Sequence, residues 1–176
     1  MSDELSLILK AMDFAARKHR DQRRMDADAT PYINHPIELA VLLVNEGGIA
    51  DINVLVAALL HDTVEDTETT QYELEEWFGR EITAIVMEVT DNKKLPKAER
   101  KRLQVENASR CSRAAKLVKL ADKICNLRDM GTNPPVEWSL ERKREYFDWA
   151  SEVVAQIQGI NPRLEQIFED VYTLRP

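Results

Sequence analysis

Apolar residues recur along this chain at the three- and four-residue spacing of α-helices, and strand-like alternation is almost absent. Residues 54–60 are apolar on nearly every side, which predicts a helix through the middle of the core. Apolar stripes of helical period are formed by Leu5, Ile8, Leu9, Met12 and Ala15, by Ile37, Ala40, Val41 and Val44, by Ile82, Ile85, Val86 and Val89, and by Leu117, Leu120, Ala121, Ile124 and Leu127. Two further helices are expected over 139–158 and 162–174, and Gly79 is expected to end another. The pattern predicts an all-α bundle.

Segments that lack this period are expected to be loops, namely 21–32, 46–51, 91–96 and 131–135. None has the composition of an interdomain linker, and no internal repeat is present. Because 176 residues is near the usual size of one compact domain, we expect a single domain over residues 1–176.

The charge balance narrows the class of protein. Lys and Arg number 24 against 31 Asp and Glu, so the net charge of −7 argues against a general binder of nucleic acid or of anionic membranes. The two cysteines match no zinc or redox spacing. The acidic N-terminus does not resemble a signal peptide, and no apolar run approaches the roughly 20 residues of a membrane-spanning helix. We expect a cytoplasmic protein.

His61 and Asp62 are the first candidates for chemistry because they directly follow the most apolar helix. Adjacent ionisable groups at that place are costly unless a partner compensates them, and a divalent metal would do so through imidazole nitrogen and carboxylate oxygen. Glu65 and Asp66 follow one turn later, and such clustered carboxylates should raise at least one pKa, as suits a poised acid or base. A solvated, acidic helix end is the alternative interpretation.

Further candidates lie elsewhere in the chain. His35 stands at the start of an apolar helix, and Asp122 interrupts an otherwise core-like helix with Asn126 one turn later on the same face. Chance could supply any one of these residues. The ordered set of His35, then His61 with Asp62, then Asp122 is harder to ascribe to chance.

This order resembles that of the HD-domain metal phosphohydrolases, whose ligands come as His, His-Asp and Asp on a helical bundle. The strings PYINHP at 31–36, ALLHDTVED at 58–66 and KLVKLADK at 116–123 through NLR at 126–128 are similar to the hydrolase module of RelA/SpoT proteins. Chain length and LPKAERKR at 95–102 are closer still to the free-standing small alarmone hydrolases of the metazoan SpoT-homologue type. The resemblance covers nearly the whole chain and leaves no room for a synthetase domain.

The resemblance implies a single-domain HD-type helical bundle that removes the 3′-pyrophosphate from guanosine tetra- and pentaphosphate (ppGpp and pppGpp), the alarmones of the stringent response. It implies one Mn²⁺ per chain, bound by His35, His61, Asp62 and Asp122. Glu65 and Asp66 match the catalytic acidic pair, for proton transfer and water orientation, and Asn126 matches a residue that helps order the site. Which of the two carboxylates acts as the base stays open.

The polyanionic substrate requires local positive charge. Segment 17–24 has five basic residues and one acid, and segment 93–102 has six basic residues and one acid. Each alone is typical of a solvated helix face, but Arg24 and Lys97 lie in strings that resemble the family's substrate-contacting segments. Trp138, Arg142 and Tyr146 follow at four-residue spacing and suit a nucleotide-binding wall, with core packing as the alternative. The resemblance favours Arg142 and Tyr146 as substrate contacts. Trp138 is a weaker candidate because it can precede the helix.

One departure leaves the substrate open. Family members commonly have Arg-Lys where this chain has Arg24-Met25, and their glycine is missing from residues 26–30. A broader nucleotide phosphohydrolase, such as an NADPH 2′-phosphatase, is therefore an alternative. A non-catalytic nucleotide-sensing module is a second alternative, which the complete set of expected ligands and acids argues against. The sequence leaves the oligomeric state open.

Overall fold

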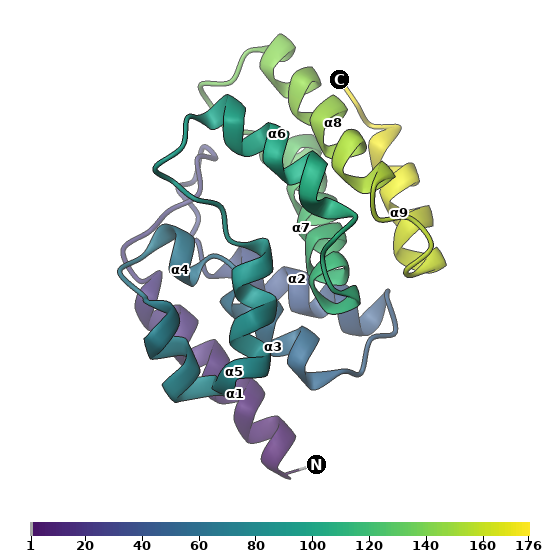
Figure 1. Cartoon of the computed structure of the whole chain (residues 1–176). Coiled ribbons are helices and arrows are strands. Elements are labelled where there is room, and N and C mark those ends of the chain that lie inside the picture. Colours follow the sequence, from purple (N-terminus) through teal and green to yellow (C-terminus); the bar gives the residue numbers. More distant parts are fainter. Residues whose placement is uncertain (1) are drawn as a thin grey trace.

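The computed structural model describes residues 2–176, which form nine α-helices and no β-strand (Figure 1). The helices are α1 (Ser2–Lys18), α2 (Asn34–Asn45), α3 (Ile52–Leu60), α4 (Thr63–Asp66), α5 (Gln71–Val89), α6 (Lys97–Ala108), α7 (Arg113–Thr132), α8 (Leu140–Ala155) and α9 (Pro162–Tyr172). The expected all-α fold is confirmed. None of these helices is both long enough and apolar enough to cross a membrane.

Helix α3 lies at the centre of the bundle, as its apolar sequence predicts. Every residue from 54 to 60 is buried, and α3 packs against α1, α2, α5 and α7 (Figure 1). Helix α7 is the second central element, since it also contacts α2, α5, α8 and α9. Buried residues from α1 through α9 form one hydrophobic cluster. His61, directly after α3, and Lys119 and Lys123 of α7 are therefore buried inside the molecule.

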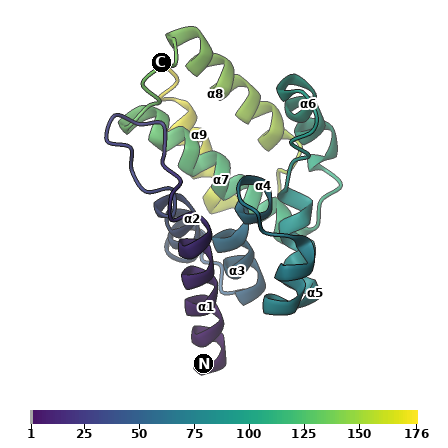
Figure 2. The same ribbon diagram turned by 90° about the vertical axis from the view of Figure 1, so that its left-hand side faces the viewer.

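The expected stripe on α1 is only partly right. Leu5 and Leu9 are 58% and 55% exposed, whereas Ala11, Phe14 and Ala15 are buried. Figure 2 shows the first turns of α1 projecting beyond the neighbouring helices, which leaves Leu5 and Leu9 exposed. Leu7 and Ile8 pack against the core but are only partly buried, and the fully buried residues of α1 lie in its second half.

The expected stripe on α2 is also displaced. Val41 and Val44 are half exposed, and Leu39, Leu42 and Leu43 make the buried face instead. With apolar residues on most sides of this short helix, the period alone does not show which face α3 and α7 will cover.

The chain does not continue as one helix through His61. Helix α3 ends at Leu60, the hydroxyl of Thr63 donates to the carbonyl of Leu60 at 2.7 Å, and the short α4 begins anew. A break is also found at Gly79, whose φ of +80° interrupts α5 where the sequence predicts a helix end. In contrast, α7 continues through Gly131 to Thr132, so the expected loop 131–135 begins two residues late.

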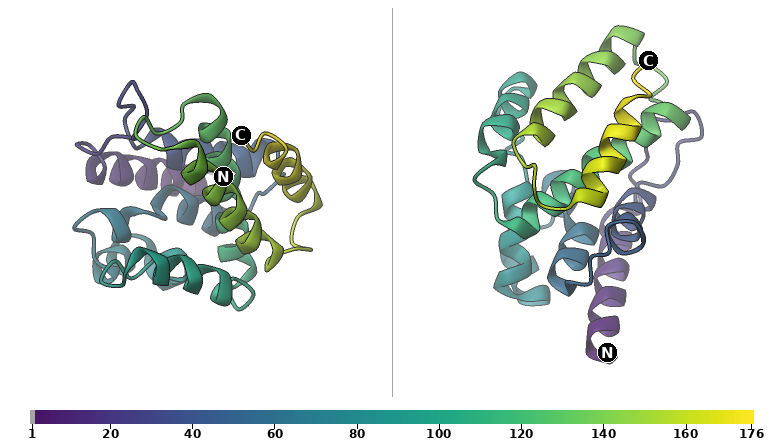
Figure 3. Two further views of the ribbon diagram at one scale, coloured as in Figure 1. Left: turned by 90° about the horizontal axis from the view of Figure 1, so that it is seen from above. Right: turned by 90° about the vertical axis from the view of Figure 1, so that its right-hand side faces the viewer.

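Helix α6 had no expected counterpart. Only Ala108 of this helix is buried, so it lacks the apolar stripe by which a helix is found in a sequence. It packs against α8, and Figure 3 shows α6, α8 and α9 at the end of the molecule opposite to the N-terminus. Lys97, Arg100, Lys101 and Arg102 of segment 93–102 are thereby placed on an ordered helix beside α8, whereas Lys93 and Lys94 lie in the loop before it.

Candidate active site

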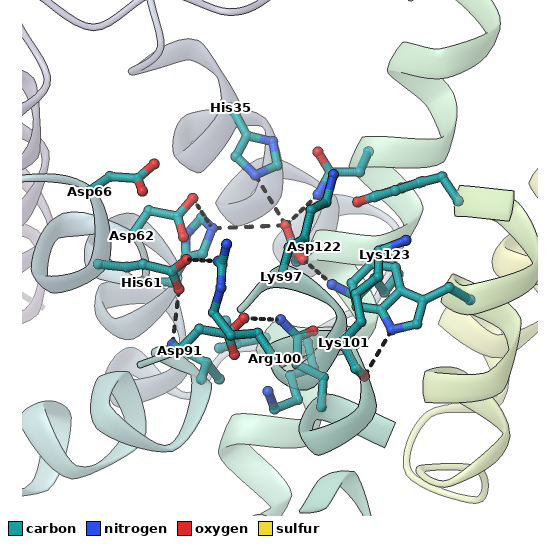
Figure 4. A pocket seen from close by; sticks show the side chains of 18 of the residues that line it. His35, His61, Asp62, Asp66, Asp91, Lys97, Arg100, Lys101, Asp122 and Lys123 are labelled. Atoms are coloured by element: carbon teal, nitrogen blue, oxygen red, sulfur yellow. Dashed lines mark hydrogen bonds and ion pairs between the residues drawn. The ribbon is translucent and has the colours of Figure 1, made fainter. Parts of the chain in front are cut away.

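The four predicted metal ligands converge from three helices (Figure 4). His35 stands in the first turn of α2, His61 and Asp62 follow α3, and Asp122 is in the middle of α7. Ligand atoms of His35, His61 and Asp62 lie within 4.8 Å of one another. Asp122 Oδ1 is 3.2 Å from His35 Nε2 and 3.9 Å from His61 Nε2.

The donor atoms suit a divalent cation. His61 Nδ1 donates to the carbonyl of Ala58 at 2.8 Å, which directs the lone pair of Nε2 toward Asp62 and Asp122. Both imidazoles are at most 5% exposed, and among residues 2–176 the Nδ1 of His35 has no hydrogen-bond partner. Two imidazole nitrogens and two carboxylates are a common donor set for first-row transition metals.

The same contacts shift the protonation of the unliganded cluster. Burial alone would lower the pKa of His61, but Asp62 and Asp122 raise it to about 9. Burial opposes ionisation of the two carboxyls, yet the nearby cations hold the pKa of Asp62 and of Asp122 below the usual range, with His61 acting first on Asp62 and Lys123 first on Asp122. Positive charge is thus favoured at this point.

Neighbouring side chains orient the two carboxylates. The Tyr32 hydroxyl donates to Asp62, and Lys123 Nζ is 2.8 Å from Asp122 Oδ2. Asn126 Nδ2 donates to Asp122 Oδ1 at 2.6 Å, which is consistent with the ordering role expected for Asn126. Burial and Asp62 raise the pKa of Tyr32, so the hydroxyl remains a donor.

Glu65 and Asp66 stand in different environments. Glu65 Oε2 accepts from the Asp91 amide at 2.9 Å, and burial, with a smaller effect of Asp62, raises the pKa of Glu65 to about 7. Asp66 accepts from Gln22 Nε2 at 2.8 Å and pairs with Lys93. One acid is therefore poised near neutrality, and the other is held in place by Gln22 and Lys93.

His19 is a residue of this site that the sequence analysis missed. Its side chain is 1% exposed, its ring packs against Tyr32 with centroids 4.9 Å apart, and its Nδ1 is 2.6 Å from Gln22 Oε1. Gln22 in turn holds Asp66. Histidine is scarce in this chain, which could have drawn attention to His19. His19 was missed because no acidic residue directly follows it, whereas Asp62 directly follows His61.

The predicted aromatic and basic wall forms as one cluster. Trp138 lies just before α8, with its ring centroid 5.6 Å from that of Tyr146. The Arg142 guanidinium is 4.2 Å and Lys97 Nζ is 5.5 Å from the centre of the Trp138 ring. Four of the five candidate substrate contacts therefore lie together.

Arg24 lies on a different side of the site. Its guanidinium pairs with Asp129 and approaches Asn126 Oδ1 at 3.4 Å. It lines a second cavity of about 410 Å³ together with Met25. Trp138 and Tyr146 border this cavity too, so it adjoins the aromatic wall. Met25 is 66% exposed at its rim.

The metal-ligand candidates line a cavity of about 240 Å³ whose opposite wall is basic. Sequence analysis singled out Lys97 within the basic segment 93–102, which also supplies Arg100 and Lys101 to that wall. The structure adds Lys119 and Lys123 from α7.

Comparison with known proteins identifies relatives of this chain. The family model described as HD domain matches residues 11–148, which is most of the chain. The chain belongs to the HD-domain family. The match contains the four metal-ligand candidates together with Glu65 and Asp66. An HD domain implies a divalent metal, and the His and Asp cluster described above could bind one.

Relatives within the HD-domain family match almost end to end. The guanosine-3′,5′-bis(diphosphate) 3′-pyrophosphohydrolase MESH1 of Homo sapiens is 57% identical over 99% of this chain and 98% of its own length. The protein of the same name from Xenopus tropicalis is 59% identical over 94% and 92% of the two chains. A solved structure of a metazoan orthologue of SpoT that hydrolyses ppGpp superposes with a TM-score of 0.93, with 47% identity over 96% of this chain and 95% of the other.

Proposed function

We propose that this chain is a Mn²⁺-dependent guanosine-3′,5′-bis(diphosphate) 3′-pyrophosphohydrolase, which converts ppGpp or pppGpp to GDP or GTP and pyrophosphate and so degrades the alarmone. The observation that carries the proposal is the convergence of His35, His61, Asp62 and Asp122 in a cavity whose other wall is basic. Relatives more than 55% identical that bear this enzyme name support it.

The proposed metal ligands are His35, His61, Asp62 and Asp122. A Mn²⁺ ion held there supplies Lewis acidity, which neutralises phosphoryl oxygens and makes water more acidic. Lys123 and Asn126 hold the two oxygens of Asp122, and Tyr32 holds Asp62.

The hydrolytic step needs a base and a proton source. An oxygen of water bonds to the phosphorus joined to ribose O3′, the bond from that phosphorus to O3′ breaks, and O3′ receives a proton. Glu65, with its pKa near neutrality, is assigned to accept the proton of the water, and Asp66 to orient it. Lys97, Arg142, Tyr146 and Trp138 are assigned to the nucleotide, with Arg24 on the opposite side.

We also propose that residues 1–176 constitute one hydrolase domain that acts in the cytoplasm on a small nucleotide, without nucleic-acid or membrane partners. The single hydrophobic cluster that includes α1 through α9 supports the domain assignment. The net charge of −7 supports the choice of partners.

The direct test is to incubate Mn²⁺-loaded protein with ppGpp and to measure pyrophosphate and GDP. We expect both products in equal amounts, and His61→Ala should abolish turnover. Turnover by the wild-type protein no faster than by His61→Ala would refute the proposed activity.

NADPH 2′-phosphatase activity is the second candidate, because Met25 stands exposed at the rim of the cavity that Arg24 lines. Loss of the family's lysine removes a charge there without touching the metal ligands. The ratio of kcat/KM for ppGpp to that for NADPH decides between the substrates. We expect this ratio to exceed one and to rise in Met25→Lys.

A further inference from the structure

Several cationic side chains on the basic wall of the catalytic cavity have no carboxylate paired with them. Lys123 pairs with Asp122, and the Arg100 guanidinium is 3.7 Å from Glu65. Across residues 2–176, however, no carboxylate lies within ion-pair distance of Lys97, Lys101 or Lys119, although all three line this cavity.

Lys119 is the most unusual of these cations. Its side chain is only 8% exposed. Burial and the neighbouring Lys123 lower the pKa of Lys119, so its surroundings disfavour the charge. An ammonium group on a largely buried side chain, with no carboxylate within ion-pair distance, is costly. Its place on the cavity wall indicates that the anion comes from a ligand.

Lys101 faces the same space from α6. Its Nζ lies 4.8 Å from the centre of the Trp149 ring, and its backbone carbonyl accepts from Trp149 Nε1 at 3.1 Å. Trp149 also contacts Lys123, at 4.5 Å from ring centre to Nζ. This indole therefore holds α6 and α7 at a fixed separation and keeps two ammonium groups on one wall.

Figure 4 shows how the two kinds of charge are separated. His61, Asp62 and Asp66 lie on one side of Asp122, and Lys101 and Lys123 lie on the other. A group that reacts beside the metal ligands and carries further negative charge would extend that charge toward the lysines. A pyrophosphoryl group has this form, whereas a phosphate monoester ends at the reacting phosphorus.

We propose that Lys119 and Lys101, with Arg100 beside them, form a subsite for the distal phosphoryl group of the 3′-pyrophosphate. The inference rests on the proposed function and adds a reason for selectivity. The subsite favours a pyrophosphate ester over a monophosphate ester such as the 2′-phosphate of NADPH. Because the contact is with a group that does not itself react, its binding energy can be used to position the reacting phosphorus.

The test removes the proposed interaction in two ways, by replacing a lysine of the protein and by omitting the distal phosphoryl group of the substrate. Wild-type protein, Lys119→Met and Lys101→Met are assayed with ppGpp and with the analogue that has a single 3′-phosphate. We expect each variant to lose roughly 10- to 100-fold in kcat/KM on ppGpp, the usual effect of deleting one charged hydrogen bond. On the 3′-monophosphate the loss should stay below about threefold, because the distal group is already missing.

Lys116→Met is the matched control, since Lys116 lies one turn earlier on α7 and does not line the cavity. It should match the wild type on both substrates. Inhibition by pyrophosphate relative to phosphate, measured at fixed free Mn²⁺, should also weaken about tenfold in Lys119→Met. Thermal melting confirms that each variant is folded, and Lys101→Met replaces a less buried side chain if Lys119→Met is not.

The outcomes separate the two proposals. If the wild-type protein does not hydrolyse ppGpp, the proposed function fails. If it does, but the lysine variants lose equally on both substrates or leave pyrophosphate inhibition unchanged, the subsite is wrong.

Discussion

At the scale of single residues, His19 explains how Asp66 keeps one orientation. The side-chain amide of Gln22 can turn either way, but it donates to Asp66 only if its oxygen faces His19. A neutral His19 with the proton on Nδ1 donates to that oxygen and selects this orientation. His19 is therefore a positioning residue, which acts on the site through Gln22.

Replacement of His19 tests this role, because asparagine can place an amide NH₂ near the position of Nδ1 and alanine cannot. We expect His19→Ala to lower kcat by about tenfold, the lower end of what a residue that orients a site residue contributes, with KM nearly unchanged. His19→Asn should recover most of that loss. Steady-state kinetics at equal Mn²⁺ content measures both. Equal losses of kcat in the two variants would leave His19 with a packing role alone.

Glu65 should control the acidic limb of the pH profile. Burial raises its pKa to about 7, and because the base must be ionised, the rate should rise with pH through that region. A bound cation lowers this pKa, so the limb is expected at or below about pH 7. Glu65→Gln should reduce kcat by about 10²- to 10⁴-fold and remove the limb.

Asp66→Asn is the comparison for Glu65→Gln. Because Lys93 and Gln22 already hold Asp66, its amide variant should be slower but should keep the same acidic limb. A limb that disappears in Asp66→Asn and persists in Glu65→Gln would reverse the two assignments.

At the scale of elements, the start of α9 shows how a helix end is fixed away from the site. Glu165 accepts from the backbone amides of Ile160 at 2.8 Å and Asn161 at 3.0 Å. The side chain of Asn161 accepts from Arg163 and Leu164. These contacts supply partners for amides that a helix N-terminus leaves unpaired.

The Glu165 contacts make part of the stability depend on pH. Burial opposes ionisation, but the backbone amides outweigh it and hold the pKa of Glu165 below its usual 4.5. The stabilisation is therefore present above that pH and is lost as the pH falls through the lower, folded-state value. We expect Glu165→Gln to reduce the free energy of unfolding by about 1 kcal/mol at pH 7.

Denaturant titrations at several pH values measure this effect. The difference between Glu165→Gln and the wild type should shrink as the solution is acidified below pH 4.5. Glu169→Gln, in the last turn of the same helix, should not destabilise the protein at any pH, because the helix dipole does not favour a negative charge there. A pH-independent difference for Glu165→Gln would mean that the ionised carboxylate is not what stabilises the helix start.

Among the elements, apolar period predicted the central helices and failed where burial is one-sided or absent. The segment 54–60 was found because it is apolar all round, and α3 is indeed enclosed. Leu5 and Leu9 have the right spacing but no neighbour to cover them, and α6 is a helix with almost no buried face. Which face of a helix packs against its neighbours depends on the tertiary arrangement of the helices. The local sequence pattern does not contain that information.

The site could be predicted only where its residues are locally unusual. His61 and Asp62 after an apolar run, and Asp122 within one, are visible because ionisable groups there need a partner. Lys119 also stands inside the apolar stretch of α7, but lysine is common on helix surfaces, and its burial is clear only once α6 and α8 are in place.

At the scale of the whole molecule, the net charge of −7 conceals a separation of charge. Four acids, Asp62, Glu65, Asp66 and Asp122, line the catalytic cavity. Asp62 and Asp66 lie on one side of Asp122, and Lys101 and Lys123 lie on the other (Figure 4). Acids brought so close repel one another unless a cation lies among them. In the absence of a metal, His61 and Lys123 supply part of that positive charge. A divalent metal that binds the folded ligand set and not the unfolded chain stabilises the folded state by linkage, so stability should depend on that metal.

Metal removal tests this dependence without any substrate. At a free Mn²⁺ concentration of 100 times Kd, linkage stabilises the folded state by about 2.7 kcal/mol, so chelation should lower Tm by roughly 5–10 °C for a chain of this size. His61→Ala removes a proposed ligand and should show almost no Mn²⁺-dependent shift in Tm. Glu65→Gln removes an acid assigned to proton transfer and should retain the full shift while losing activity. If Glu65→Gln also loses the shift, Glu65 binds the metal, and the role of base passes to Asp66.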